Sequence, residues 1–528
     1  MTAPADLVLT NGEVHTLGDP DETHEAVAIR GGCIVRLASS EEIDFLVGVE
    51  TEVVGLAGRV LLPGFTDAHT HMTTLGRSLV HADLSTADSP GDAVELLRER
   101  AGEVADDEWV LGFGYDESTW DESRYLTRND LDAVTGAQPV AAVREDMHVA
   151  SLNSVALDRL LDEMPEDDVQ TDAEGPTGVV VEAAVDPLYA AIEPGPDETR
   201  GLLESAQAYA TERGVVGVHD MVRQSHAPGV YRAMDADDDL TLRVRLNYWS
   251  DHLDSLVDLG ERTNHGSAFV RVGAVKSYTD GSFGGRTAKV SEPYADAEES
   301  ADAAASGEDG DDDAADATGS WVVPPEELRN LVARADDAGL QFTAHAIGDE
   351  AVDAVLDAYE RCDDPGASRH RFEHAELTSD AAIERFAEAD VVASVQPNFL
   401  KWAGEGGLYE SRLGDRRTET NRYADLQSAG VRLAFGSDCM PLDPLLGVHH
   451  AVNAPAESQR LGVTEALRAY TSGAAYAGFD EDRLGTVEVG KLADMVVLES
   501  SPWAQPDAIR DIDVALTVVD GEVVHDGR

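Results

Sequence analysis

Two histidines separated by one residue, His69 and His71, close the run "LLPGFTDAHTH" at residues 61–71. In a β-strand, the side chains at positions i and i+2 point to the same side. Two imidazoles on one side of a strand form a ready chelate for a divalent metal ion. The pair alone is weak evidence for a metal site, because surface histidines are common. The preceding Pro-Gly-Phe and Asp67 make the motif more specific. We therefore predict a metal site at the end of this strand.

Four further residues of metal-binding type each stand near the end of a later strand-like run. They are Lys276 in "VGAVK", His345 in "FTAHA", His374 in "RFEHA" and Asp438 in "AFGSD". One buried histidine is more often a satisfied core residue than a ligand. A series of such residues at successive strand ends is hard to obtain by chance. The same-side rule directs them to one mouth of a barrel, where the active sites of such barrels lie.

The elements that would carry these residues are strand-like runs alternating with amphipathic helical segments over residues 61–482. This pattern predicts an α/β fold with a (β/α)8 TIM-like barrel. More than eight runs qualify, so not every one is assigned to the barrel. Examples of the strand-like runs are 139–144, 215–220, 272–277, 340–346, 371–375 and 431–438.

Both chain ends read differently from the middle. Residues 1–60 and 483–528 hold short β-rich runs joined by Asn-Gly and Gly-Gly turns, and we expect them to form one small composite β-sandwich domain. Residues 295–320 contain ten acidic residues and no basic one. We expect a solvated, disordered loop there.

The composition is strongly acidic, with 103 Asp and Glu against 39 Lys and Arg, a net charge of −64, and only four lysines. Such a chain would be repelled by a phosphate backbone, which argues against a nucleic-acid partner. The acid is spread along the whole chain, as expected for adaptation to a salty cytoplasm, where screening lengths fall to about 3 Å at 1 M salt. The composition resembles that of proteins from halophilic archaea, and so indicates habitat rather than function.

Three distant cysteines, Cys33, Cys362 and Cys439, form no Cys-x-x-Cys pair, which favours a reducing compartment over a disulfide framework. The first residues lack the basic and apolar regions of a signal peptide. No stretch of 18 apolar residues exists to span a membrane. We expect a cytoplasmic protein with no membrane partner.

The order of these motifs resembles the metal-dependent amidohydrolase superfamily. The runs "GFGYDESTW", "REDMHVASLNSVAL", "KSYTDGSFGGRTA", "HAIGDEAVD" and "LGTVEVGKLADMVVLE" are similar to the family-3 amidohydrolases, the YtcJ-like group that includes N-substituted formamide deformylase. The resemblance extends over nearly the whole chain. The acidic segment 295–320 is its clearest departure.

The resemblance implies six metal ligands and a general base. One metal would be held by His69, His71 and Asp438, the second by His345 and His374, with Lys276 between them. Lys276 would carry a carbamate, formed with carbon dioxide, that offers one oxygen to each metal. Asp438 would take a proton from the attacking water and hand it to the leaving nitrogen.

Two alternatives stay open for the lysine and the metal count. Lys276 could remain an ammonium paired with Asp280 or another acid, or the site could hold a single metal with the lysine as a hydrogen-bond donor. His, carboxylate and carbamate ligands suit zinc, manganese and iron alike. We expect one or two divalent ions per chain, with zinc as the leading candidate.

A second group of residues is predicted, on weaker grounds, to contact substrate. Each has a structural alternative, which is a loop for the first two, a salt bridge for the arginine and core packing for the aromatic pair. The residues are Asp146, His148, Arg286, Tyr115 and Trp120.

We expect a hydrolase of a non-peptide carbon–nitrogen bond, acting on a small-molecule amide such as an N-substituted formamide. Alternatives are hydrolysis of a cyclic amide, or deamination with Asp349 or Glu350 as proton shuttle. A non-catalytic scaffold is a weaker alternative, because all six ligand positions are intact. The oligomeric state is open, with a homodimer as one candidate.

Overall fold

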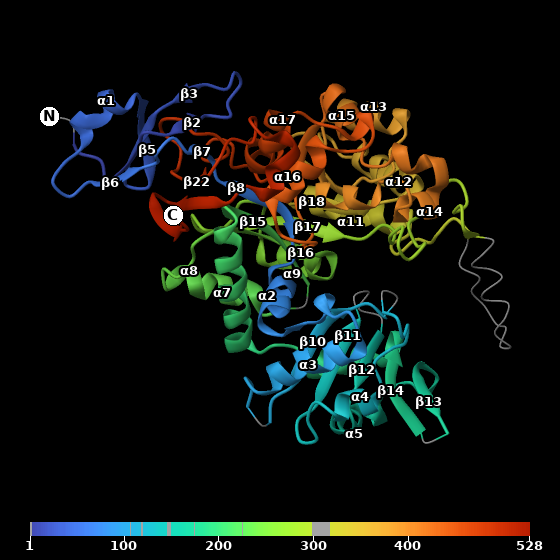
Figure 1. Ribbon diagram of the computed structural model, residues 1–528. Helices are drawn as coiled ribbons and strands as arrows, with labels where there is room; N and C mark the ends of the chain where they lie inside the picture. Colours follow the sequence, from blue (N-terminus) through green and yellow to red (C-terminus); the bar gives the residue numbers. More distant parts are fainter. Residues whose placement is uncertain are drawn as a thin grey trace. The chain divides into compact units, whose positions relative to one another are not determined.

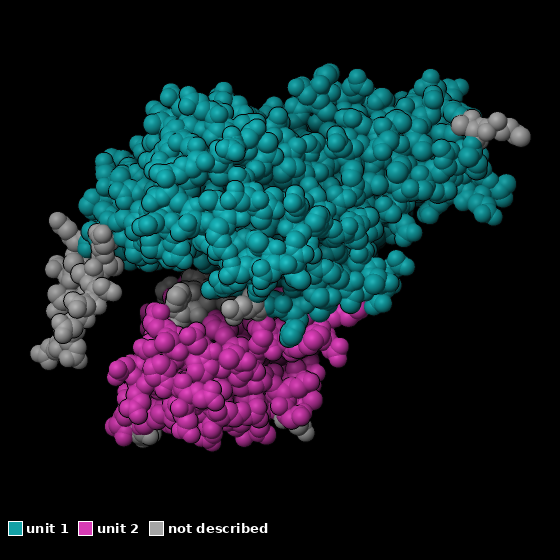
Figure 2. Space-filling model, turned by 180° about the vertical axis from the view of Figure 1, so that it is seen from behind, with its two compact units in different colours: residues 1–71, 207–528 teal, residues 72–206 magenta. Residues whose placement is uncertain are grey.

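The computed structural model describes residues 3–105, 107–117, 120–144, 149–173, 175–223, 225–297 and 317–528. The chain divides into two compact units, residues 1–71 with 207–528 and residues 72–206 (Figure 2). Most of the acidic segment expected to be a disordered loop, residues 298–316, lies outside the described residues.

The first unit contains an eight-stranded sheet in which each strand runs parallel to the next. The first and last strands meet through their ends, because the backbone N–H of Asp438 donates to the carbonyl of His69 at 2.8 Å. The predicted TIM-like barrel is thereby confirmed. The strands, in order, are β8 (Phe65–Thr70), β15 (Val215–Val222), β16 (Arg243–Trp249), β17 (Val270–Ser277), β18 (Gln341–Ala346), β19 (Arg371–His374), β20 (Val392–Val395) and β21 (Arg432–Phe435).

Helices follow these strands and bury one face each. In α13, Ser379 caps the first turn by accepting from the Ala382 N–H, and Ile383 and Phe386 form part of the buried face. The helices of this part are α8 (Ala227–Ala236), α9 (Leu253–Leu259), α11 (Pro325–Asp337), α12 (Asp349–Tyr359), α13 (Asp380–Glu388), α14 (Leu408–Leu413), α15 (Tyr423–Ser428), α16 (Pro444–Val452), α17 (Val463–Arg468) and α18 (Ala474–Ala477).

Two further sheets of the same unit are built from the chain ends. One has the order β5-β4-β1-β6 and the other β24-β23-β22-β7-β2-β3. N-terminal β7 pairs antiparallel with C-terminal β22, which brings the blue and red ends of the chain together (Figure 1). The strands are β1 (Leu7–Thr10), β2 (Glu13–His15), β3 (Thr23–His24), β4 (Ala26–Arg30), β5 (Cys33–Ala38), β6 (Glu52–Gly55), β7 (Val60–Pro63), β22 (Met495–Leu498), β23 (Val514–Val519) and β24 (Glu522–Asp526).

Side chains of both sheets share one apolar core, in which Leu7 and Val27 of the first sheet cluster with Leu61 and Val497 of the second. This is the packing that a sandwich requires. The domain boundaries given above, 1–60 plus 483–528 and 61–482, stay a prediction, because these sheets and the barrel lie within one compact unit.

The second unit has its own six-stranded sheet with the order β13-β14-β12-β11-β10-β9. The strand predicted at 139–144 exists as β11, but it lies in this sheet and not in the barrel. The elements are β9 (Ala82–Asp83), β10 (Val110–Tyr115), β11 (Val140–Arg144), β12 (Val149–Leu152), β13 (Val169–Asp172), β14 (Gly175–Val181), α2 (Met72–Val80), α3 (Pro90–Ala101), α4 (Arg128–Asp132), α5 (Ser154–Leu160), α6 (Asp186–Ala191) and α7 (Pro196–Glu212), the last of which continues into the first unit.

The three cysteines, all within the described residues, are free. Across the parts of the chain that the structure describes, none of the helices combines the length and apolar character needed to cross a membrane.

Candidate metal centre

The six predicted ligands come from the ends of five barrel strands. His69 lies in β8 with His71 directly after it, Lys276 in β17, His345 in β18, His374 at the end of β19, and Asp438 three residues after β21. Because the strands are parallel, their C-terminal ends meet at one end of the barrel. The structure thus brings the strand ends that carry these residues to one end of the barrel, and a ligand role for the six stays a prediction.

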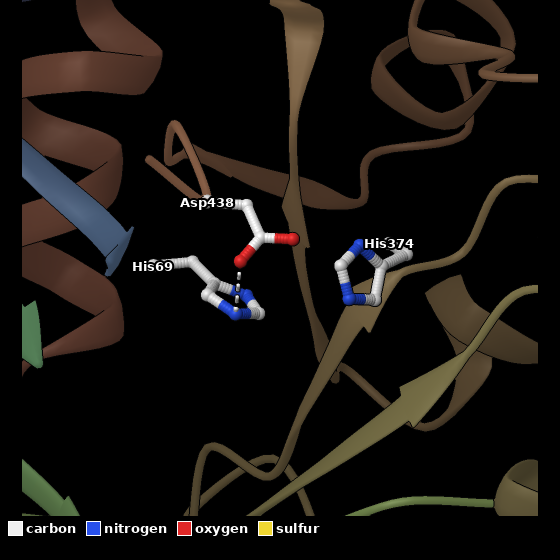
Figure 3. A group of neighbouring side chains, drawn as sticks. All are labelled: His69, His374 and Asp438. Carbon is white, nitrogen blue, oxygen red and sulfur yellow. Dashed lines mark ion pairs between the residues drawn. The ribbon is translucent and has the colours of Figure 1, made fainter. Parts of the chain in front are cut away.

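His69, His374 and Asp438 form the tightest group, and one ligand atom from each lies within 4.8 Å of the others. Figure 3 shows the three side chains converging from separate parts of the chain. Asp438 Oδ1 lies 3.5 Å from His69 Nε2 and 3.1 Å from His71 Nε2. The ring of His345 adjoins that of His374, with centroids 4.5 Å apart. Such a donor set of imidazoles and a carboxylate fits a divalent transition metal.

Hydrogen bonds decide which ring nitrogen of two histidines is free. His69 Nδ1 lies 2.7 Å from Glu373 Oε2, so it carries the proton and leaves the Nε2 lone pair directed at Asp438. His345 Nε2 donates to the Gly281 carbonyl at 2.9 Å, which leaves its Nδ1 as the ligand atom. Each ring thus presents one lone pair.

Burial sets protonation states in the site that suit metal binding. It lowers the pKa of His69, His345 and His374, so these imidazoles are neutral at pH 7, as a ligand must be. Burial opposes ionisation of Asp438, but its contact with His71 offsets the burial, and the pKa of Asp438 is lowered to about 2. At His71 burial acts in the same direction as at the other histidines, but the hydrogen bond to Asp438 outweighs it and raises the pKa. The site therefore combines three neutral imidazoles and an ionised carboxylate that favours the protonated form of His71.

Lys276 is 1% exposed, and its Nζ has no hydrogen-bond partner among the described residues. Burial lowers its pKa to about 8, although the charges of Glu373 and Asp438 oppose the shift. The carboxylate of Asp280, an alternative partner, instead accepts the backbone N–H groups of Ile347, Gly348 and Lys289. An unpartnered buried amine beside the histidines is chemically available for modification or ligation.

Two of the candidate ligands have positive φ angles, His374 at +74° and Asp438 at +53°. Residues with a side chain rarely adopt this conformation, and such outliers gather at functional sites. In β19, alternation directs Arg371 and Glu373 to the barrel interior, so the next residue, His374, would point away from it. The backbone turn at His374 lets its ring lie beside His69 instead, with ring centroids 5.1 Å apart.

Two buried residues of the site, Glu373 and Arg371, were missed by sequence reasoning, and Asp67 was noted beside the histidine pair without a role. Glu373 contacts His69, Arg371 contacts Glu373, and Asp67 accepts the backbone N–H groups of His69 and Ser437. The available signal was the pattern of the fully buried strand "RFEH", where two opposite charges stand at a spacing of two. Neither charge can remain ionised in a barrel interior without a partner.

The residues predicted to contact substrate are placed less favourably. Asp146 and His148 lie outside the described residues. Tyr115 and Trp120 are buried in a core of the second unit, where Tyr115 OH lies 3.1 Å from Ser151 Oγ and Trp120 Nε1 donates to the Ala87 carbonyl at 2.7 Å. A substrate role for these four residues stays a prediction.

Arg286, the fifth residue of that group, follows the turn after β17. Its guanidinium makes two hydrogen bonds to Asp296, at 2.7 and 3.1 Å. This is the salt bridge that the sequence left as its alternative. A contact between Arg286 and substrate stays a prediction.

A parallel barrel with converging histidines and an aspartate at the C-terminal ends of its strands defines a metal-dependent hydrolase. The amidohydrolase family profile matches residues 52–525, and the chain belongs to that family. It is 30% identical to the putative amidohydrolase YtcJ of Bacillus subtilis, over 98% of each chain.

Two further relatives cover similar lengths. The N-substituted formamide deformylase of Arthrobacter pascens is 26% identical, over 99% of this chain and 98% of its own. The crystal structure of an uncharacterized metal-dependent hydrolase from Pyrococcus furiosus superposes with a TM-score of 0.79 at 29% identity, over 94% of this chain and 99% of the other.

Proposed function

We propose that this chain hydrolyses the carbon–nitrogen bond of an exocyclic, non-peptide amide, and that an N-substituted formamide is a representative substrate. The observation that carries the proposal is the convergence of His69, His374 and Asp438 within 4.8 Å, beside the buried amine of Lys276. The similarity to the A. pascens deformylase supports the choice of amide. A family likeness on this fold leaves the substrate to be tested.

The residues that would hold a divalent metal, with zinc as the leading candidate, are His69, His71, His345, His374 and Asp438. Bound there, the ion would supply Lewis-acid polarisation of the substrate carbonyl and activation of water. Asp438, held ionised, accepts the proton of the attacking water and returns it to the leaving nitrogen. Proton transfer at that carboxylate therefore couples the attack of water to the departure of the amine.

Carboxylation of Lys276 is part of the proposal. A neutral Nζ attacks carbon dioxide and loses one proton, which gives a carbamate with two oxygens for two metals. Support comes from the burial of Nζ, its lack of a partner among described residues and its lowered pKa. The presence of two metals would then depend on this single lysine.

Aromatic rings flank the imidazoles on both sides and favour an apolar substituent on the amide nitrogen. Tyr278 packs edge-on to His345 at 5.0 Å and against Trp249 at 4.6 Å. Phe399 stacks parallel to His374 at 5.9 Å. Tyr278 is 36% exposed, so its ring is open to a ligand.

Deamination is less favoured by the contacts, which do not bear on the hydrolysis of a cyclic amide. Asp349, a candidate proton shuttle for deamination, instead bonds to Ser291 and pairs with Arg416 at 3.2 Å. Glu350, the other candidate, is exposed.

Metal content per chain, measured by elemental analysis on protein kept in high salt, is the first experiment. About two ions per chain would support the bridged site with a carboxylated Lys276. About one would assign the lysine a hydrogen-bonding role. No ion after reconstitution would contradict the proposal and favour a scaffold. Screening for amine release from N-formyl and other N-acyl amines, each at matched concentration, would then test the substrate class.

A further inference from the structure

We propose that Arg371 and Glu373 form a positioning pair that fixes His69 as a metal ligand. Glu373 accepts the hydrogen bond of the ring proton on His69 Nδ1, and Arg371 holds the Glu373 carboxylate in place at that nitrogen. The inference rests on the proposed function, since it concerns affinity for the divalent metal.

Both carboxylate oxygens of Glu373 are fully used. Oε2 faces His69 Nδ1 at 2.7 Å, while Oε1 accepts from Thr343 Oγ1 at 2.5 Å and from Arg371 Nε at 2.8 Å. The residue is 0% exposed. A carboxylate so enclosed is not itself a ligand, and it acts on the metal through the imidazole, as outer carboxylates commonly do.

Arg371 is held from three other strands of the barrel. Its guanidinium donates to the Ala68 carbonyl in β8 at 2.5 Å, to Ser394 Oγ in β20 at 2.8 Å and to His219 Nδ1 in β15 at 2.9 Å. It is 1% exposed. An arginine cannot lose its charge in a protein. It therefore places a fixed positive charge beside Glu373.

The consequence of this placement is a choice between two tautomers of His69. Glu373 accepts the Nδ1 proton because Arg371 and Thr343 hold its other oxygen. If the carboxylate were not held against Nδ1, the ring proton could sit on Nε2, the nitrogen that faces Asp438. A histidine in that form has no lone pair to offer the metal.

Gln396 makes the tautomer of His69 more dependent on Glu373, because the Gln396 side-chain Nε2 lies 3.3 Å from the same His69 Nδ1. The amide is a second donor to that nitrogen and favours the non-ligating tautomer. At 2.7 Å, the charge-assisted contact to Glu373 outweighs it. Loss of the Glu373 acceptor would leave Gln396 as the partner of that nitrogen.

The test measures the affinity of the metal-free, full-length protein for Zn²⁺ by competition with a chromogenic chelator in high salt. For Glu373→Gln we expect Zn²⁺ binding about 10- to 100-fold weaker than in the wild type. Arg371→Met should weaken binding to a similar extent, although Arg371 contacts no ligand. Thr517→Val is the matched control, because it removes a buried hydroxyl in β23, bonded to the Thr211 carbonyl and outside the barrel strands, and should leave the affinity within about twofold.

The double variant Glu373→Gln/Arg371→Met separates positioning from folding. It removes both buried charges together, which proteins often tolerate. We expect its affinity to be no weaker than that of the weaker single variant, since both changes act through one proton. Selective ¹⁵N labelling of histidine should show the His69 proton on Nδ1 in the wild type and on Nε2 in the variants, with His69→Gln assigning the signal.

The outcomes distinguish this inference from the proposed function. A wild-type protein that binds no Zn²⁺ would overturn the proposed function and the positioning role with it. Wild-type binding matched within twofold by a folded Glu373→Gln variant would overturn the positioning role alone. If Arg371→Met does not fold, Glu373→Gln and the double variant still decide the matter.

Discussion

Asp438 meets His69 twice, once through its backbone N–H, which donates to the His69 carbonyl at 2.8 Å, and once through its carboxylate, whose Oδ1 lies 3.5 Å from His69 Nε2. The first contact joins the last barrel strand to the first. The second assembles the candidate metal site. Closure of the barrel and formation of the site therefore depend on the same two residues, and the φ of +53° at Asp438 is what allows both contacts.

Asp438→Asn should abolish most turnover while leaving the fold intact. The amide keeps the size of the side chain and the backbone bond to His69, but it cannot accept a proton. We expect turnover of an N-formyl amine to fall about 10²- to 10⁴-fold. Asp443→Asn is the control, because Asp443 caps α16 in the same loop and asparagine caps equally well. Activity retained in Asp438→Asn would refute the assignment of the base.

Lys276→Met should remove one metal per chain. The thioether has nearly the length of the lysine stem but no nitrogen to carboxylate, so the second ion loses its bridge. Metal analysis should change from about two ions to about one, and ¹³C NMR after exposure to labelled carbon dioxide should lose its carbamate signal. Lys401→Met, at an exposed lysine, should change neither. A wild-type protein without a carbamate signal would contradict the carboxylation.

The six candidate ligands could be predicted to lie together because strand periodicity is a local property of the sequence. His69 and His71 share a side of one strand, and the other four stand at later strand ends, so a single assumption about the barrel places them together. Glu373 could not be found in this way. Glu373 is adjacent to His374, and strand alternation would place only one of the two side chains in the barrel interior. The positive φ at His374, which lets both side chains reach the site, cannot be read from the sequence.

The second unit was missed for a related reason. The run at 139–144 is as apolar as a barrel strand. The local pattern of apolar residues predicts a strand, but it does not predict which strand it will pair with. In the structure β11 pairs with β10 and β12 and with no barrel strand. Pairing is a long-range property, decided by which complete sheet buries the most surface.

Acid should destabilise the second unit through His81. Its Nδ1 is buried without a hydrogen-bond partner among the described residues, and its ring lies 5.7 Å from Phe113. Burial, aided by Arg100 and Arg77, lowers its pKa from 6.5 to about 4. The unfolded chain thus binds a proton that the folded chain rejects, so stability is complete above pH 6.5 and falls as the pH drops toward 4. The loss is on the order of 3 kcal/mol.

His81→Phe removes the titrating group and should flatten this part of the stability profile, measured by urea unfolding between pH 7 and pH 4. His226→Gln, at an exposed histidine, is the control and should keep the wild-type slope. An identical slope in His81→Phe would show that other groups cause the acid sensitivity.

Salt should stabilise the whole protein, because acidic groups far outnumber basic ones in a chain with a net charge of −64. The imbalance is visible locally, where Arg385 alone contacts Asp353, Asp357 and Glu360 at 2.7–3.1 Å. Screening shortens from about 10 Å at 0.1 M to about 3 Å at 1 M, which removes repulsion between neighbouring carboxylates. We expect the melting temperature to rise by on the order of 10 °C between these conditions in KCl. Salt could act by screening charge or by strengthening the burial of apolar surface. Sucrose strengthens burial without screening charge, so it should raise the melting temperature less. An unchanged melting temperature and full activity in dilute buffer would mean that the acidic surface is not an adaptation to salt.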